Sequence, residues 1–251
     1  MNALLELRQV SKHFGGVRAV DEISFSLAQG ELVGLIGPNG AGKTTVFNLV
    51  SGIHPLSQGE VWYRGSVISG SSPTRIARLG IARTFQNVRL FRTLTVIEHV
   101  MVAQTCRKAG LLALFSPFAT SAEKTRRREA LEVLDKVGLG ARRDELARNL
   151  PYGGQRRLEI ARALATSPEL LLLDEPAAGL NDTETEDLRL MLENLRASGY
   201  AILLVEHDMK LVMRVCPRIL VLNFGKLIGA GTPAEVRANQ EVVDAYLGTS
   251  D

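Results

Sequence analysis

Residues 35–45 read Leu35-Ile36-Gly37-Pro38-Asn39-Gly40-Ala41-Gly42-Lys43-Thr44-Thr45, and this stretch decides the fold of the chain. It matches G-x-x-x-x-G-K-[ST] at every fixed position. Glycine backbone turns tightly enough for successive N–H groups to converge on one phosphate. The apolar run 32–36 predicts a strand before the loop, and apolar residues at helical spacing predict a helix that begins near Lys43. Strand, glycine loop and helix together predict a site for a nucleoside triphosphate.

Each part of this loop has an expected role. The helix after the loop directs the positive end of its dipole at the same phosphates. Lys43 is expected to reach the β- and γ-phosphates, and the Thr44 hydroxyl is expected to bind Mg²⁺. The nucleotide-binding residues predicted here are Gly37, Pro38, Asn39, Gly40, Ala41, Gly42, Lys43, Thr44 and Thr45.

Composition limits the alternatives. With 251 residues and 45% hydrophobic content, the chain can bury a full core, and its net charge is only +3. Arginine clusters such as 126–128 are interpreted as solvated helix faces and not as a nucleic-acid patch, because no aromatic side chains alternate with them. The most lipid-like stretch, 109–119, is too short to span a bilayer and contains Pro117. We therefore expect no nucleic-acid partner, and a chain that does not cross a membrane alone.

The order of apolar runs predicts an α/β fold. Runs at 32–36, 170–173, 201–205 and 219–222 lack polar alternation, which is typical of parallel strands covered on both faces. The runs 4–10 and 60–63 alternate more and indicate a partly exposed antiparallel sheet. Residues 95–165 show only helical patterns, clearest at 123–137. Three capping boxes are expected, at Thr95 with Glu98, Thr183 with Glu186, and Thr232 with Glu235.

Two further strands end in polar groups. The apolar run 170–173 leads into Asp174 and Glu175, and the run 201–205 leads into Glu206 and His207. Asp174 is expected to hold the Mg²⁺ shell, and Glu175 to activate the attacking water. Since both strands should end at the same edge of the sheet, we expect His207 to contact the γ-phosphate.

A second glycine-containing segment opens another helix. Residues 150–157 read Leu-Pro-Tyr-Gly-Gly-Gln-Arg-Arg and lead into a helical pattern. Such a helix N-terminus is a second anion-binding site. A plain loop-to-helix junction explains the glycines but not a second phosphate-like site, and one nucleotide needs two such helices only if two chains share it.

Taken together, these motifs resemble the ATP-binding cassette family over essentially the whole chain. The resemblance implies a P-loop NTPase (RecA-like) parallel-sheet core, an N-terminal antiparallel β subdomain and an inserted all-helical subdomain. The expected divisions are 1–93, the β subdomain with the first half of the core; 94–165, the helical subdomain; 166–230, the second half of the core; and 231–251, a helical tail. It also implies a head-to-tail dimer that holds ATP and Mg²⁺ between one chain's phosphate loop and the other's signature segment, residues 151–155.

The resemblance assigns roles to individual residues. It implies catalytic roles for Lys43, Gln86, Glu175 and His207, and metal contacts for Thr44, Gln86 and Asp174. It adds to the nucleotide-binding residues Phe14, Tyr152, Gly153, Gly154 and Gln155. Two positions depart from the family: Tyr152 replaces a serine, and Asn181 replaces an aspartate after Ala178. Tyr152 cannot copy a short hydroxyl, so its ring is expected to turn aside and leave the glycine amides to the phosphate.

A narrower resemblance concerns four segments, 83–91, 152–162, 174–181 and 206–213, together with the tail from 231. They are similar to the ATPase subunit of bacterial branched-chain amino acid importers. That resemblance implies that the chain works with a second ATPase subunit and two transmembrane permeases, and indirectly with a periplasmic solute-binding protein. It also implies that the chain is a peripheral protein on the cytoplasmic face of the bacterial inner membrane. Rivals are the same machine serving urea, amides or lipopolysaccharide, and a soluble cassette ATPase of translation or DNA repair. A P-loop GTPase lacks support, because no Asn-Lys-x-Asp motif is present.

Overall fold

The computed structural model describes residues 3–85, 90–108 and 119–247, and its strands form two sheets. The first sheet has the order β2-β1-β4-β5 and is antiparallel throughout. Its strands are β1 (Ala3–Phe14), β2 (Val17–Ala28), β4 (Gln58–Tyr63) and β5 (Ser66–Val67). The sequence prediction of an antiparallel sheet from the runs 4–10 and 60–63 is therefore confirmed.

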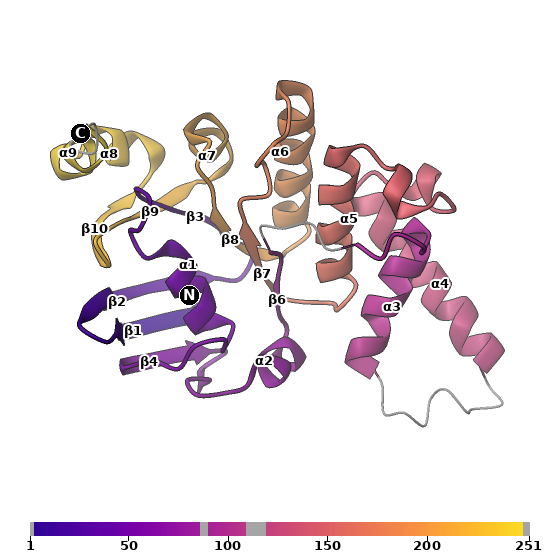
Figure 1. Cartoon of the computed structure of the whole chain (residues 1–251), viewed down its shortest axis with the longest axis horizontal. Helices are drawn as coiled ribbons and strands as arrows, with labels where there is room; N and C mark the ends of the chain where they lie inside the picture. The colour runs from indigo at the N-terminus through magenta and orange to yellow at the C-terminus, as the bar shows by residue number, and fades with distance from the viewer. Residues whose placement is uncertain (1–2, 86–89, 109–118, 248–251) are drawn as a thin grey trace.

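The second sheet has the order β10-β9-β3-β8-β7-β6 and crosses the middle of the molecule (Figure 1). From β9 to β6 the neighbours run parallel, and β10 is antiparallel at one edge. The strands are β3 (Leu32–Ile36), β6 (Ile81–Arg83), β7 (Leu170–Asp174), β8 (Ala201–Val205), β9 (Arg218–Asn223) and β10 (Lys226–Gly231). All four predicted parallel strands are present.

Both faces of this sheet are covered, which explains the uninterrupted apolar runs. Along β7, Leu171 and Leu173 pack into one hydrophobic core, while Leu170 and Leu172 pack into the other. The first core lies under the helices α5, α6 and α7, and the second lies between the two sheets around α1. A strand with solvent on neither face needs no polar alternation.

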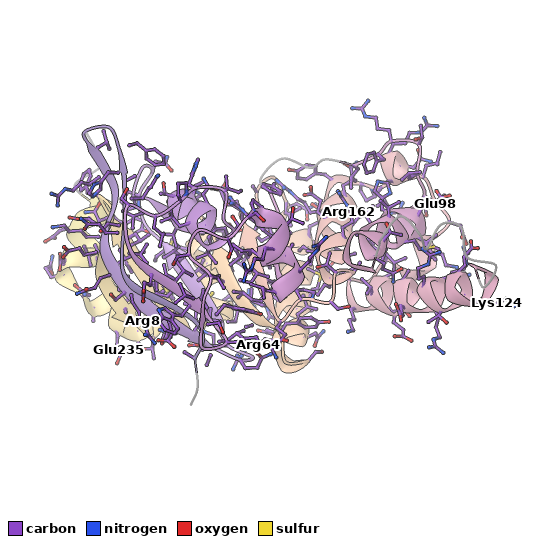
Figure 2. All side chains as sticks on the ribbon, turned by 90° about the horizontal axis from the view of Figure 1, so that it is seen from below. Arg8, Arg64, Glu98, Lys124, Arg162 and Glu235 are labelled. Atoms are coloured by element: carbon purple, nitrogen blue, oxygen red, sulfur yellow. The ribbon has the colours of Figure 1, made fainter. Side chains whose placement is uncertain are left out.

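The helices are α1 (Lys43–Val50), α2 (Pro73–Leu79), α3 (Val96–Lys108), α4 (Ala119–Lys136), α5 (Tyr152–Leu164), α6 (Asp182–Ala197), α7 (Met209–Val215), α8 (Pro233–Ala238) and α9 (Gln240–Leu247). Helices α3, α4 and α5 pack together at one end of the molecule, and α8 and α9 lie at the other (Figure 1). Seen from below, the labelled Glu98 and Lys124 lie toward the first end and Glu235 toward the second (Figure 2). Among the described residues between 95 and 165 there is no strand, as expected.

One predicted helix cap is wrong. The boxes Thr95 with Glu98 and Thr232 with Glu235 are present, but α6 begins at Asp182 and is capped by Asn181 with Glu184. The predicted pair, Thr183 with Glu186, falls two residues too late: Thr183 lies inside the first turn, and Glu186 binds arginines instead. Two overlapping patterns fit the sequence, and the helix begins at the earlier one, whose cap Asn181 follows two residues after Gly179 with its positive φ of 80°.

No described helix combines the length and the apolar character that crossing a membrane requires.

Candidate active site

The phosphate loop connects β3 to α1 and lies at the carboxyl end of the parallel strands. Two of its glycines are required by space. A Cβ on Gly37 would lie 2.1 Å from the Leu222 carbonyl oxygen, and one on Gly42 would lie 2.5 Å from the Ala19 carbonyl oxygen. Gly42 also has φ 105°, at the start of α1. The loop borders a cavity of about 200 Å³ whose lining is Ala19, Asn39, Gly40, Ala41, Gly42, Lys43, Thr44, Thr45, Glu175 and His207.

Lys43 is held over this loop. Its Nζ donates to the carbonyl oxygens of Gly37 at 2.7 Å and Pro38 at 2.9 Å. Burial lowers the pKa of Lys43, and the carboxylates of Glu175 and Asp174 partly offset that effect. The ammonium thus has two carboxylates nearby, and a phosphate would add a further negative partner.

Glu175 and His207 meet across the ends of β7 and β8. The two strands are paired with Asp174 opposite Val205, so the polar residues that follow them emerge side by side. His207 Nε2 lies 2.8 Å from Glu175 Oε1, and the Glu175 N–H donates to the Val205 carbonyl at 2.9 Å. Glu175 has φ 49°, a left-handed conformation that is uncommon for a residue with a side chain and is often found at functional sites. The prediction that both strands end at one edge is confirmed.

Glu206 supports this arrangement from beneath and was not assigned a role from the sequence. Its side chain is buried and accepts N–H groups from Ala177 at 2.6 Å and from His207 at 3.1 Å. Burial raises the pKa of Glu206, and these backbone bonds oppose the rise. The sequence feature that could have identified Glu206 is its place directly after the apolar run 201–205, next to His207.

Asp174 is fixed by the neighbouring edge strand. Arg83, the last residue of β6, donates to Asp174 Oδ2 at 3.0 Å, and the Thr84 hydroxyl accepts the Asp174 N–H at 3.3 Å. Arg83 also donates to Asn48 Oδ1 at 2.6 Å and to Ser51 Oγ at 3.1 Å, which ties Asp174 to the helix that follows the phosphate loop. No role was predicted for Arg83 from the sequence.

Of the three predicted metal contacts, Thr44, Asp174 and Gln86, the structure describes the first two. Thr44 lines the phosphate cavity, and Asp174 lies close enough to Lys43 to affect its pKa. Hydroxyl and carboxylate oxygens are suitable ligands for Mg²⁺, which usually keeps several waters and binds through few protein groups. Gln86, predicted as a metal and catalytic residue, lies outside the described residues.

The signature segment opens α5 away from this cavity. Tyr152, Gly153, Gly154 and Gln155 are absent from its lining. Gly153 and Gly154 are buried, and Gln155 Nε2 donates to the Leu150 carbonyl at 2.9 Å. The Tyr152 ring lies against Gly179, since a Cβ there would be 3.0 Å from a ring carbon, and the Arg156 guanidinium is 5.2 Å from the ring centre. The ring thus packs to the side, as expected from its size.

Phe14, predicted to stack on the nucleotide base, ends β1 next to β2, the strand whose Ala19 lines the cavity. Its ring is 45% exposed and contacts His54 edge to face at a centroid distance of 5.4 Å. Lys12 Nζ lies 4.9 Å from the centre of the same ring. An exposed ring beside a phosphate site is available for stacking, but it does not line the cavity itself.

A second, larger hollow lies between the core and the helical end, near Arg162 in Figure 2. Its volume is about 510 Å³, and its lining comes from α2, β6, α3 and α5 and from loop residues, among them Ser51 directly after α1. Exposed apolar side chains gather there, namely Ile53, Phe85, Phe91 and Val102. We refer to this hollow as the lateral groove.

The chain matches known sequences along nearly its whole length. The family described as "ABC transporter" matches residues 20–178, and "Branched-chain amino acid ATP-binding cassette transporter" matches residues 226–251. The high-affinity branched-chain amino acid transport ATP-binding protein LivG of Salmonella typhimurium is 47% identical over 249 residues, 98% of each chain. The lipopolysaccharide export system ATP-binding protein LptB of Escherichia coli is 36% identical over 246 residues, again 98% of each.

Solved structures of ATP-binding cassettes have the same fold as this chain. The ADP form of MJ1267, an ATP-binding cassette of an ABC transporter, superposes with a TM-score of 0.87 at 28% identity and covers 99% of this chain and 100% of its own. The dimeric cassette MJ0796 superposes with a TM-score of 0.77 at 26% identity and covers 91% of this chain and 98% of its own. The chain belongs to the ABC transporter family and is one of its ATP-hydrolysing cassettes.

Proposed function

We propose that this chain hydrolyses ATP to power the import of branched-chain amino acids across a bacterial inner membrane. The observation that carries the proposal is the cavity in which the phosphate loop, Glu175 and His207 meet. The likeness to LivG supports the choice of solute, and the match of the tail to the branched-chain amino acid cassette family supports it independently. The lower identity to LptB argues against lipopolysaccharide export.

Within this site the groups divide the chemistry. The loop amides and Lys43 bind the phosphates, and Glu175 accepts the proton of the attacking water. His207, 2.8 Å from Glu175, holds that carboxylate in place and contacts the γ-phosphate. Phe14 stacks on the base, and Gln86 completes the catalytic and metal contacts.

Mg²⁺ would be held by Thr44 and Asp174 together with the phosphates. It would supply charge neutralisation on the oxygens of the transferred phosphoryl group. Arg83 keeps Asp174 in position for this contact by binding one of its carboxylate oxygens, which leaves the other for the metal's water shell.

The separation of the two anion sites supports an assembly of two ATPase subunits. Since Tyr152, Gly153, Gly154 and Gln155 do not line the phosphate cavity, a second ATPase subunit would bring its own signature segment to this chain's ATP. The lateral groove and Gln86 would contact one of two permease subunits at the cytoplasmic face of the membrane. A periplasmic binding protein would act indirectly, and no nucleic acid takes part.

The division of the chain into four parts, with boundaries after residues 93, 165 and 230, is retained as part of this proposal.

Uptake by cells tests the solute. Deletion of the gene should abolish high-affinity uptake of labelled leucine, isoleucine and valine, and a plasmid copy should restore it, whereas a Glu175→Gln copy should not. Uptake of labelled urea and the export of lipopolysaccharide serve as parallel readouts. Unchanged leucine uptake with loss of either of those activities would contradict the proposed solute and favour a rival within the family.

A further inference from the structure

The carboxylate of Glu184 connects the first turns of two helices. Oε2 accepts the Asn181 N–H at 3.1 Å and so caps its own helix α6, while Oε1 accepts the Gly153 N–H of α5 at 3.3 Å. A Cβ on Gly153 would lie only 2.5 Å from Oε1, so a residue larger than glycine would displace the carboxylate. One side chain of α6 therefore accepts a hydrogen bond from a backbone N–H at the start of α5, which we call the signature helix because the signature segment opens it.

The charge of Glu184 is directed at this amide. Among the described residues no lysine or arginine forms a salt bridge with it, and its hydrogen bonds go to backbone N–H groups. Glu186, two residues along the same helix, differs because Arg189 and Arg214 pair with it. An anion at a helix N-terminus is stabilised by the unpaired amides and by the helix dipole.

The same amides are those that the proposed function gives to the partner's γ-phosphate. Gly153 and Gly154 lie in the first turn of α5, and the Tyr152 ring lies against Gly179. The Gly153 N–H, which Glu184 occupies, cannot serve the carboxylate and a phosphate together without repulsion, since like charges at about 4 Å repel by about 1 kcal/mol even in bulk water. The carboxylate and the phosphate therefore compete.

We propose that Glu184 is a positioning residue that occupies the signature helix of the open subunit and must be displaced by the γ-phosphate of the partner's ATP. It thereby sets the ATP concentration at which the two subunits close. The inference rests on the proposed head-to-tail dimer. Glu184 is not among the residues that line the cavity of the chain's own phosphate loop, so it acts on closure and not on the first binding step.

Removing the charge while keeping the cap tests this role. Glu184→Gln retains a side chain that suits a capping box, and Glu184→Asp keeps the charge but withdraws it from Gly153. In the transporter purified with its membrane subunits, the ATP concentration for half-maximal hydrolysis should fall roughly fivefold in the Gln variant, as expected for a partly screened like-charge contact. It should fall less in the Asp variant. Glu186→Gln is the matched control and should leave it unchanged.

A second measurement separates closure from binding. Affinity of the isolated subunit for a fluorescent ATP analogue should be the same in wild type and Glu184→Gln. An unchanged or raised half-maximal ATP concentration in both Glu184 variants would overturn the inference while leaving the proposed function intact. Absence of ATP hydrolysis in the wild-type complex would instead overturn the proposed function.

Discussion

The guanidinium of Arg83 donates to Oδ2 of Asp174 over 3.0 Å, and the side chains of both residues are only 8% exposed. The remaining bonds of Arg83 reach Asn48 and Ser51 at the end of α1, and its charge lies 5.5 Å from the Phe47 ring centre. A single arginine thus joins the strand that carries Asp174, which we propose as a metal contact, to the helix that follows the phosphate loop. Because Arg83 also lines the lateral groove, this link extends to the surface that we propose for the permease.

Arg83→Met should destabilise the chain strongly. The substitution leaves the Asp174 carboxylate buried without its partner, which costs about 3–5 kcal/mol of unfolding free energy in typical cases. Arg64→Met is the control, because Arg64 forms an exposed pair with Glu169 at 3.1 Å and such pairs contribute about 0–1 kcal/mol. Urea unfolding of the two variants measures the difference. Equal losses would show that the Arg83–Asp174 pair contributes little.

Much of the site could be predicted because its residues are close in sequence. The pattern from Gly37 to Thr44 defines its own local geometry, and the run 170–175 gives both a buried strand and the acids at its end. Parallel strands end at one edge, so the meeting of Glu175 with His207 also followed from the order of the elements.

The remaining features depend on neighbours that the sequence does not identify. Arg83 meets Asp174 only because β6 pairs with β7, and β6 has just three residues. Glu184 reaches Gly153 because α5 and α6 bring their first turns together, and the competing pattern at Thr183 hid its role as a cap. The position of the Tyr152 ring could be expected from its size, but its contact with Gly179 could not.

Phe14→Ala should weaken ATP binding about tenfold, the value of one lost stacking contact. The ring is exposed and has a lysine over it, so few packing contacts are lost in the free chain. Titration with ATP and GTP measures the effect. A stacking ring discriminates poorly between bases, so GTP should be hydrolysed at a comparable rate, and strong selectivity for ATP would argue for base-reading hydrogen bonds instead.

Tyr152→Ser should keep most ATP hydrolysis, because the ring packs on Gly179 and leaves the glycine amides to the phosphate. Gly154→Asp should abolish it, since Gly154 is buried in the first turn of α5 and a carboxylate there repels phosphate. Vanadate-sensitive turnover of the membrane complex is the assay. Equal inactivity of the two variants would make the tyrosine ring part of the site.

His99 should make stability depend on pH. Its Nε2 accepts the Phe91 N–H at 3.0 Å and its Nδ1 lies 2.8 Å from the Thr95 carbonyl, an arrangement that requires the neutral ring. Burial, together with the charge of Arg162, lowers the pKa of His99 against the opposing effects of Thr95 and Glu98. The unfolded chain therefore binds a proton first as the pH falls below about 6.5, and folding loses stability from there down to the folded pKa.

The stability advantage of wild type over His99→Asn should accordingly shrink between pH 7 and pH 5. Chemical unfolding of both proteins at several pH values measures it. A pH-independent difference would mean that the protonated ring is tolerated in the fold.

The most direct test of the central claim is closure of the ATPase dimer by ATP in the Glu175→Gln variant. This substitution removes the proposed base but none of the phosphate-binding loop, so hydrolysis should nearly stop while ATP still binds. With Mg²⁺ and ATP, the variant subunit in its transporter complex should accumulate in a closed, ATP-bound state that cross-linking between phosphate loop and signature segment detects. Lys43→Ala should fail to bind ATP and stay open. Wild-type hydrolysis by Glu175→Gln, or a wild-type dissociation constant for ATP in Lys43→Ala, would contradict the account.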